Sequence, residues 1–232
     1  MTLYTDPRLT ALGILHGTTD RQSGNMRLAD CTRNLFNTLH LAEEKILRFK
    51  QIHSDKLCSA CSARQAAALQ QPPLPEADGW VLTAPGYGAA ILTADCTPLF
   101  VWDEHGEVLG LSHCGWRGVA AELPVKTVQT MQQHGAKGRL CAWVGPHIQA
   151  CCFEVQQDTA VYFPQDTRTR QGKLFVDLNQ AILRQLTQNG LHPDDIVFSA
   201  HCTCCEPDRF FSYRRDHTKD ALLSFIYKPA TK

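Results

Sequence analysis

Short apolar runs, separated by glycine, proline and aspartate, dominate the middle of the chain. They occupy residues 80–83, 89–93, 99–102 and 108–112. Each run is too short for a typical helix and is bounded by residues that favour turns. The pattern therefore predicts strands of a substantially buried sheet.

Helical spacing appears on both sides of these runs. Residues 30–49 carry Leu35, Leu39, Ala42 and Ile46 at helical intervals, which predicts a helix. Further helices are predicted over 119–134, before Gly135, and over 178–189, before Gly190. Strands are predicted over 141–144 and 196–200, and the proline-rich stretch 70–77 is expected to be a surface loop. The alternation indicates a layered α/β fold with a mixed sheet, which we expect to form a single domain over residues 1–232.

Composition narrows the range of partners. The chain has 232 residues, is 44% hydrophobic, and carries 23 basic and 23 acidic residues, so its formal net charge is zero. A neutral chain gives no electrostatic reason to expect nucleic acid or an anionic membrane as partner, and it permits a homodimer. The sequence has no apolar run of the roughly 18 residues that a membrane span needs, and its first residues do not resemble a signal peptide. These features predict a cytoplasmic location.

Eleven cysteines are many for such a chain. In a cytoplasmic protein, reduced thiols that pack in the core or bind metal are more usual than disulfides. Cys58 and Cys61 form a CxxC pair, and further cysteines gather at 151–152 and 202–205. A structural zinc site built from these groups is one interpretation, but the pairs lack a recognisable ribbon spacing, so packed free thiols are the preferred one.

The segment 93–118, TADCTPLFVWDEHGEVLGLSHCGWRG, combines two predicted strands with a thiol and an imidazole. If Glu104 and His105 form a two-residue turn, Cys96 and His113 face one another with β-carbons about 5 Å apart. That separation suits two ligands of one metal ion. His53, in a segment 50–57 that reads as a strand edge, is the third candidate ligand.

A thiolate with two imidazoles favours zinc, and three protein ligands leave a fourth position open for catalysis. Blue-copper sites use the same three ligands, usually with an axial methionine. Met1, Met26 and Met131 are distant in sequence from the candidate ligands, and none of the ten histidines forms a His-x-His pair, so copper is disfavoured.

Two other interpretations use the same residues. Cys96 and His113 could form a nucleophile–base pair of a metal-free cysteine hydrolase, with Asp95 as the orienting group. Alternatively, a fourth ligand such as His147 or Cys151 would close the site and make it a metal-binding module without turnover. Outside the cluster, Arg117 at a helix start is a candidate anion clamp. The segment 210–216, FFSYRRD, could stack a planar base and hold a phosphate, or form a core edge.

Five segments together resemble one family. QIHSD, TADCTPLFV, SHCGWRG, VGPHIQACCFEV and CTCCEPDRFFSYRRD occur in an order and spacing similar to those of the multicopper polyphenol oxidase, or laccase-like, family. That family includes the bacterial peptidoglycan editing factor and a purine-nucleoside-metabolising enzyme of animal macrophages. The resemblance covers about residues 16–227.

The resemblance implies a single α/β domain and a zinc ion held by His53, Cys96 and His113. It also implies roles near the active site for Arg117, Arg21 and Asn25. We expect Asp95 and Arg117 to act in catalysis near the metal, and Arg21, Asn25 and Arg214 to bind substrate. The sequence departs from the family pattern around Asn25, where a loop is shortened, and at His147 and Gln149.

For function, the resemblance implies a zinc-dependent purine nucleoside enzyme. The expected reactions are phosphorolysis of adenosine, inosine, guanosine and methylthioadenosine, and deamination of adenosine. The alternative that it implies is an amidase that removes L-serine from UDP-N-acetylmuramoyl-L-serine during peptidoglycan editing. A small-molecule substrate is common to both.

Overall fold

Two β-sheets packed face to face form the centre of the computed structural model, which describes residues 2–230; residues 1, 231 and 232 of the expected domain lie outside the description. The larger sheet has six strands in the order β13-β9-β7-β8-β5-β4, and the smaller has five in the order β1-β2-β14-β6-β3. The six strands of the larger sheet are β4 Leu57–Ala60, β5 Gly79–Leu82, β7 Thr97–Asp103, β8 Leu109–Cys114, β9 Leu140–Val144 and β13 Ile196–Phe198. The five of the smaller sheet are β1 Leu3–Tyr4, β2 Leu15–Thr19, β3 Ile46–Leu47, β6 Tyr87–Thr93 and β14 Leu222–Lys228.

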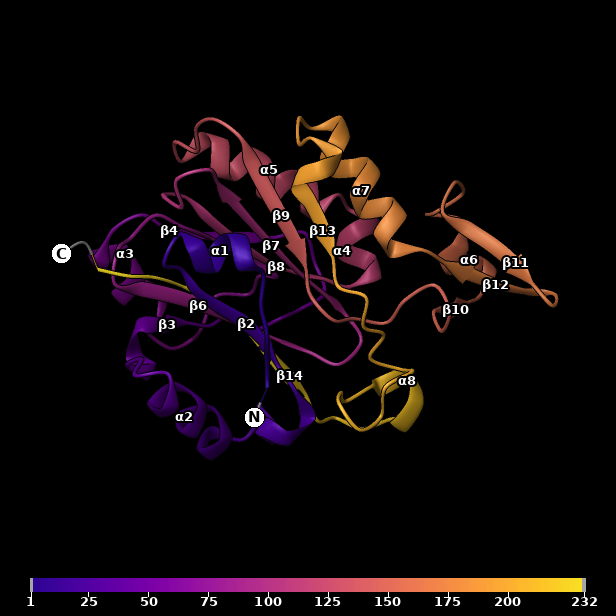
Figure 1. Cartoon of the computed structure of the whole chain (residues 1–232), viewed down its shortest axis with the longest axis horizontal. Coiled ribbons are helices and arrows are strands. Elements are labelled where there is room, and N and C mark those ends of the chain that lie inside the picture. Colours follow the sequence, from indigo (N-terminus) through magenta and orange to yellow (C-terminus); the bar gives the residue numbers. More distant parts are fainter. Residues whose placement is uncertain (1, 231–232) are drawn as a thin grey trace.

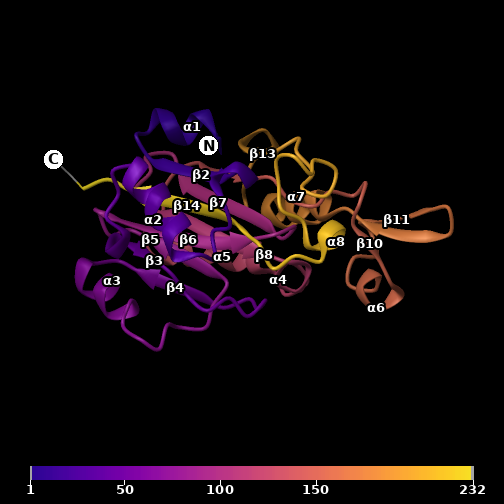
Figure 2. The same cartoon turned by 90° about the horizontal axis from the view of Figure 1, so that it is seen from below.

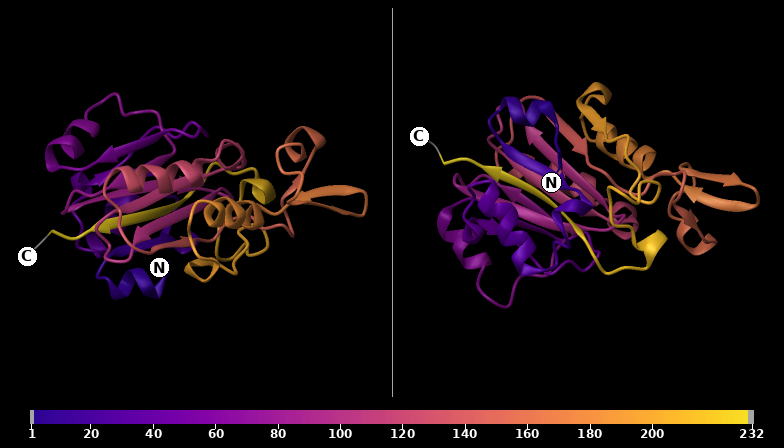
Figure 3. Two further views of the ribbon diagram at one scale, coloured as in Figure 1. Left: turned by 90° about the horizontal axis from the view of Figure 1, so that it is seen from above. Right: turned by 60° about the horizontal axis from the view of Figure 1, so that its bottom comes forward.

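Helices cover the outer face of each sheet, which gives four layers (Figures 1 and 3). On the larger sheet lie α4 Trp116–Ala120, α5 Leu123–Gln133 and α7 Leu178–Gln188, and on the smaller sheet lies α2 Ala29–Thr38. The remaining short helices are α1 Pro7–Ala11, α3 Ala63–Leu69, α6 Gln157–Ala160 and α8 Tyr213–Asp216. The expected layered α/β fold with mixed sheets is therefore confirmed, since β3–β6, β4–β5 and β9–β13 pair in parallel and the other pairs are antiparallel.

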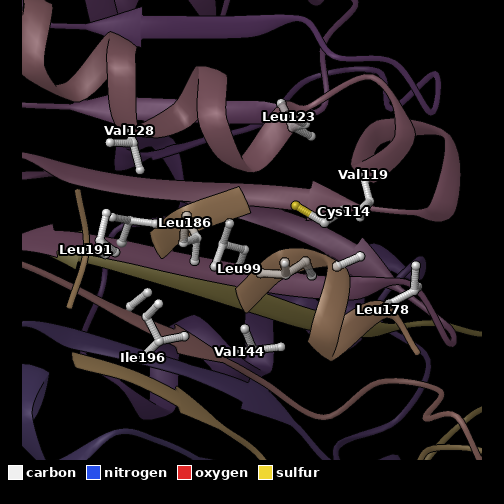
Figure 4. Packing of buried hydrophobic residues seen from close by; sticks show 14 of the residues in the cluster. Leu99, Cys114, Val119, Leu123, Val128, Val144, Leu178, Leu186, Leu191 and Ile196 are labelled. Carbon is white, nitrogen blue, oxygen red and sulfur yellow. The ribbon is translucent and has the colours of Figure 1, made fainter. Parts of the chain in front are cut away.

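The alternation of side chains explains why the strands read as continuous apolar runs. In β7, Phe100 and Trp102 point between the two sheets, whereas Leu99 and Val101 point toward the helices. Both faces are buried, so every position is apolar. Figure 4 shows the helix-side layer, in which Leu99 and Val144 lie near Leu186 of α7.

A small third sheet extends from one end of the molecule (Figure 2). It contains β10 Glu154–Val155, β11 Thr167–Arg170 and β12 Lys173–Val176, in the order β10-β12-β11. Val155 and Val176 join the core beneath the helices, which anchors the base of this extension.

Two of the predicted helices differ from the structure. The helix expected over 30–49 ends at Thr38, because the chain reverses through His40, whose φ is +54°, and then forms a 3₁₀ turn and strand β3. Leu39 and Ile46 still pack with Leu35, so their spacing reports a shared core and not one continuous helix. The helix expected over 119–134 is divided into α4 and α5 at Glu122, whose φ is +62°.

The β7–β8 hairpin has a longer turn than the sequence suggested. The observed register pairs Thr97 with Cys114 and Pro98 with His113, so the predicted opposition of Cys96 and His113 is wrong by two residues. The side chain of Asp103 accepts hydrogen bonds from the backbone N–H groups of Glu107 and Val108, which stabilises the wider turn. A shift of two residues keeps Cys96 and His113 on the same face of the hairpin.

Within residues 2–230, no helix is long and apolar enough to cross a membrane.

The interface between the sheets provides a first test of the fold. Phe100 is fully buried there, and the Phe100→Ala variant should lose roughly 3–5 kcal/mol of unfolding free energy because it leaves a cavity between the sheets. Val161→Ala, at a site that is 61% exposed, should change stability by no more than about 0.5 kcal/mol. Urea denaturation followed by circular dichroism measures both, and equal losses would contradict the described packing.

Candidate metal centre and cavity

His53, Cys96 and His113 converge at one end of the larger sheet. Each offers one ligand atom, and these atoms lie within 4.8 Å of one another. Cys96 directly precedes β7, His113 lies near the end of β8, and His53 belongs to the loop before β4. The two imidazole rings are nearly perpendicular, with centroids 4.9 Å apart. The structure thus brings together the three residues that sequence reasoning selected, although the expected strand edge around His53 is a loop.

Asp78, which sequence reasoning missed, orients His113. The Nδ1 atom of His113 lies 2.9 Å from Oδ1 of Asp78, and the His113 backbone N–H donates to the Asp78 carbonyl oxygen at 2.7 Å. A carboxylate can only accept, so Nδ1 carries the proton and Nε2 is left as the ligand atom. A carboxylate behind a histidine ligand is the usual way in which proteins fix the ring of a metal-binding histidine.

The same carboxylate holds the loop that carries His53. The backbone N–H groups of Ile52, His53 and Ser54 donate to Asp78 at 3.3, 3.0 and 2.6 Å, and the Ser54 hydroxyl donates at 2.8 Å. His53 has a φ of +57°, a left-handed conformation that is uncommon for a residue other than glycine. Asp78 is completely buried, so its hydrogen bonds stabilise both the charge and the strained loop.

Charge is distributed unevenly over the cluster. Burial disfavours ionisation of Cys96, but the neighbouring His113 and a hydrogen bond from His53 outweigh it and lower the thiol pKa to about 6. Burial disfavours protonation of His113, but Cys96 and Asp78 outweigh it and raise the imidazole pKa to about 9. Burial also works against ionisation of Asp78, yet hydrogen bonds from His113 and Ser54 hold its pKa below the usual value. The centre therefore favours a thiolate, the form of cysteine that binds metals.

Gly115 leaves room for the cluster. A β-carbon at this position would lie 3.3 Å from the Cys96 sulfur, 3.3 Å from the His53 ring and 4.0 Å from the His113 ring. The HCGWRG segment thus needs its first glycine for space beside the three ligand groups.

Asp95 anchors the other side of Cys96. Its Oδ1 accepts a hydrogen bond from the Thr203 hydroxyl at 2.6 Å, and its Oδ2 accepts from the Ser212 hydroxyl at 3.0 Å and the Arg214 backbone N–H at 2.7 Å. Asp95 also has a left-handed backbone, with φ +90°. The carboxylate that contacts the His113 ring is Asp78, so Asp95 is not the orienting group of a Cys96–His113 pair.

Two adjoining cavities share the ligand cluster. One has a volume of about 780 Å³ and the other about 590 Å³, and both are lined by His53, Ala94, Cys96 and Tyr213. The larger cavity has an aromatic and cationic wall that includes Trp116, Arg117, Phe153 and Arg214. Its volume lies in the range of small-molecule sites.

The cationic candidates occupy different surroundings. Arg117 is exposed and stacks on Trp116, with its guanidinium carbon 4.4 Å from the ring centroid. Arg214 donates to the carbonyl oxygens of Cys152 and Glu154 at 3.2 and 2.7 Å. Both residues line the larger cavity.

Arg21 and Asn25, expected to bind substrate, are not among the residues that line these two cavities, although Asn25 contacts Asp220, which lines the smaller one. The Arg21 guanidinium donates to the Pro207 carbonyl oxygen at 2.8 Å and lies over the Phe211 ring. The Asn25 side chain donates to Asp220 at 2.7 Å and accepts from the Ala221 backbone N–H at 3.1 Å. In this structure both residues hold loops together.

His147 is buried and directs Nδ1 to the Gly145 carbonyl oxygen at 2.8 Å. It lines neither cavity, and burial lowers its pKa. Neither His147 nor Cys151 belongs to the three-residue cluster, and among the described residues this cluster has no fourth protein ligand.

The donor set fits zinc better than blue copper. Met26 packs beneath α2 and Met131 packs in the core under α5, so neither of these described methionines is an axial ligand. One thiolate and two neutral imidazoles suit a tetrahedral ion with one open position.

Comparisons with known proteins agree with this fold. Residues 17–227 match the family model described as multi-copper polyphenol oxidoreductase laccase. A purine nucleoside phosphorylase of Aquifex aeolicus is 32% identical over 184 residues, which is 79% of this chain and 83% of that protein. An adenosine deaminase named RL5, from an unknown prokaryotic organism, is 30% identical over 202 residues, covering 82% of this chain and 77% of that protein.

A solved structure shares the architecture. The crystal structure of YlmD from Geobacillus stearothermophilus superposes with a TM-score of 0.87 at 26% identity, covering 97% of this chain and 94% of that one. Since the family model spans most of the sequence and the fold agrees throughout, the chain belongs to the multi-copper polyphenol oxidoreductase laccase family.

Proposed function

We propose that the chain is a zinc-dependent purine nucleoside enzyme that catalyses phosphorolysis of purine nucleosides and deamination of adenosine. The observation that carries the proposal is the open three-ligand cluster of His53, Cys96 and His113 at the junction of two cavities. The names of the relatives, purine nucleoside phosphorylase and adenosine deaminase, supply the substrate class. Zinc in such a three-ligand site supplies Lewis acidity to a water or substrate oxygen.

The residues around the centre divide the remaining work. Asp78 keeps the proton on Nδ1 of His113, so Nε2 is the ring atom that would release its proton and bind the metal. Trp116, Phe153 and Tyr213 supply aromatic surface on which a purine can stack.

Arg117 is the candidate phosphate ligand in the larger cavity. Arg214 already donates to two backbone carbonyl oxygens, whereas the Arg117 guanidinium makes no hydrogen bond to another described residue. An exposed guanidinium stacked on an aromatic ring is held in place and keeps its donors available for an anion. Phosphorolysis needs this group, whereas hydrolytic deamination does not.

A second candidate function is metal-free cysteine hydrolysis. Cys96, whose pKa is lowered, would be the nucleophile and His113 its base. Asp78, which contacts His113, would be the orienting carboxylate. The amidase reaction on UDP-N-acetylmuramoyl-L-serine is the alternative substrate assignment, and it can use either chemistry.

The direct test is an assay of the purified protein with adenosine, with and without phosphate, beside UDP-N-acetylmuramoyl-L-serine. The proposal expects adenine and ribose 1-phosphate with phosphate, and inosine and ammonia without it. Both activities should disappear on chelation and return with added zinc. Release of L-serine as the sole reaction would replace the purine assignment, and full turnover after chelation would favour the cysteine hydrolase.

Cys96→Ala should lose both metal from this centre and turnover, because it removes the one anionic ligand of the cluster. Zinc analysis and the nucleoside assay measure the two effects, and circular dichroism checks the fold. Turnover by a metal-free Cys96→Ala protein would contradict the zinc and the cysteine-nucleophile mechanisms together.

Asp78→Asn should weaken zinc binding at the centre by roughly 10- to 100-fold, because an amide orients His113 less firmly and loses the negative charge behind it. A competition titration with a chromophoric chelator measures the affinity. Asp103→Asn is a matched control, since Asp103 is also a buried carboxylate that accepts backbone N–H groups, but in the β7–β8 turn. Equal losses of zinc affinity in both variants would contradict a specific role for Asp78.

Arg117→Ala should raise the KM for phosphate by roughly 10- to 100-fold. This factor corresponds to the loss of one charge-assisted hydrogen bond, which contributes about 1.5–3 kcal/mol. Deamination of adenosine in the absence of phosphate should change little. Arg64→Ala, at an exposed position on α3, is the control for loss of one positive charge. An unchanged KM for phosphate in Arg117→Ala would exclude Arg117 as the phosphate ligand.

A further inference from the structure

A second group of metal-ligating side chains lies outside the centre described above. The thiols of Cys151, Cys152, Cys202 and Cys205 are all within 4.8 Å of one another. The Cys205 sulfur lies 3.5 Å from that of Cys151 and 3.2 Å from that of Cys152. In a tetrahedral Zn(Cys)₄ site with bonds of about 2.3 Å, the sulfur atoms are about 3.8 Å apart. The four sulfurs are therefore already gathered near the spacing that one zinc ion requires.

The fold brings these thiols together from two separate loops. Cys151 and Cys152 follow β9, whereas Cys202 and Cys205 follow β13, so Cys152 and Cys205 are 53 residues apart in sequence (Figure 1). A parallel bridge between His147 and Cys202 aligns the two loops. The backbone N–H of Gln149 donates to the Cys202 sulfur at 3.4 Å. A backbone N–H directed at sulfur stabilises negative charge on that sulfur.

Positive charge surrounds the four thiols. Arg170 donates to the Cys151 carbonyl oxygen at 2.7 Å, and Arg214 donates to that of Cys152 at 3.2 Å. Arg215 donates to the carbonyl oxygens of Thr203 and Cys204 at 2.8 and 3.1 Å. Four thiolates with one Zn²⁺ carry a net charge of −2, which nearby guanidinium groups offset.

The two carboxylates near the thiols are paired with other cationic groups and not with these three arginines. Glu206, next to Cys205, is paired with His201 and Arg209 at 3.0 and 3.1 Å. Glu154, beyond Cys152, is paired with Lys173 at 2.9 Å. Three arginines thus donate hydrogen bonds to carbonyl oxygens of the two loops that carry the thiols.

We propose that Cys151, Cys152, Cys202 and Cys205 bind a structural zinc ion that joins the β9–β10 loop to the loop between β13 and α8. Four thiolates close the coordination sphere, so this ion has no open position for substrate. On binding, each thiol that was protonated releases its proton to solvent, and four Zn–S bonds form without oxidation.

The site would hold the wall of the substrate cavity. Cys152 and the residues after it line the larger cavity, as do Tyr213 and Arg214 beyond the second loop. Because Thr203 also donates to Asp95, the cysteine-linked loops connect directly to the residue that precedes Cys96. The structural ion would therefore hold this wall in place. The first centre supplies other lining residues, His53 and Cys96, which we call the floor of the cavity.

Two alternatives use the same sulfurs. The 3.2 Å separation of Cys152 and Cys205 would permit oxidation to a disulfide by an external oxidant, and the four residues could also remain free thiols. Both alternatives predict no zinc at this site, and they differ from each other in the number of reactive thiols. Metal content and thiol number together therefore distinguish the three states in one preparation.

The test is zinc analysis of the full-length protein, purified under reducing conditions without chelator and freed of loosely bound metal by gel filtration. Wild type should contain two zinc ions per chain. Cys96→Ala should retain one, held by the four cysteines, and Cys151→Ser/Cys205→Ser should retain the other. Cys204→Ser is the control, since Cys204 lies between the proposed ligands but outside the four-thiol group, and it should keep both ions.

A second measurement does not depend on the folding of a cysteine variant of the loops. Cys96→Ala protein reconstituted with Co²⁺ should show the intense sulfur-to-cobalt charge-transfer absorption of a four-thiolate site. The absence of this absorption would overturn the proposal, as would a wild-type protein whose only zinc is lost in Cys96→Ala. A Cys152–Cys205 disulfide in non-reducing peptide mass mapping of the isolated protein would overturn it as well. None of these outcomes depends on the nucleoside assay, so failure of this site and failure of the proposed activity are separable.

Discussion

The buried carboxylate of Asp78 is the constraint on which the candidate metal centre depends. It lies directly before β5 and accepts hydrogen bonds from the His53 loop and from the His113 ring. A buried carboxylate that lost these partners would carry an unpaired charge in the core, which is very unfavourable. Folding of the larger sheet and positioning of both histidines are therefore linked, because each provides what the other needs.

Asp95 plays the corresponding part for the thiol. Its backbone carbonyl oxygen accepts from the Ile148 N–H at 3.0 Å, and its side chain accepts from Thr203, Ser212 and Arg214. Left-handed backbone at a non-glycine residue costs about 1–3 kcal/mol and persists only where neighbours enforce it. Asp95 and His53 both show it, one on each side of the ligand cluster. The two carboxylates thus hold strained backbone that aims the ligands at a common point.

Sequence patterns predicted the elements better than their junctions. The strands were predictable because both faces are buried, so apolar runs stand out against turn residues. The break after Thr38 was not, because Leu35, Leu39 and Ile46 recur at helical intervals while Ile46 pairs with β6. The β7–β8 register was wrong because the turn is set by Asp103, whose side chain caps two N–H groups that no apolar pattern reports.

The site, too, was predictable from the sequence in part only. Cys96 and His113 stood out because two ligand types flank one hairpin, and the family resemblance supported His53 and Arg117, which were already candidates from their local sequence. Asp78 lies 25 residues from His53 and 35 from His113, so no local motif marks it. Its one signal is a charged residue directly before an apolar strand, which is also the signal of an ordinary surface turn. Arg21 and Asn25, carried over from the resemblance, make loop contacts in this chain, and their substrate roles stay predictions, as does the extent of the domain.

The floor of the larger cavity, at His53 and Cys96, and its wall, which includes Phe153, Glu154 and Arg214, belong to different parts of the fold. The ligand cluster is tied to the central sheet through Asp78, whereas Phe153, Glu154 and Arg214 belong to the β9–β10 loop, to the short strand β10 and to the short helix α8. Core sheets tolerate little rearrangement because their packing is dense, while loops accept substitution at lower cost. For the proposed reactions, substitutions in the wall can therefore change which reactant reaches the bound nucleoside without moving the ligand cluster. In this chain Arg117 lines the larger cavity and is stacked on Trp116, so in the proposed reaction it can act on the anion without contacting the ligands.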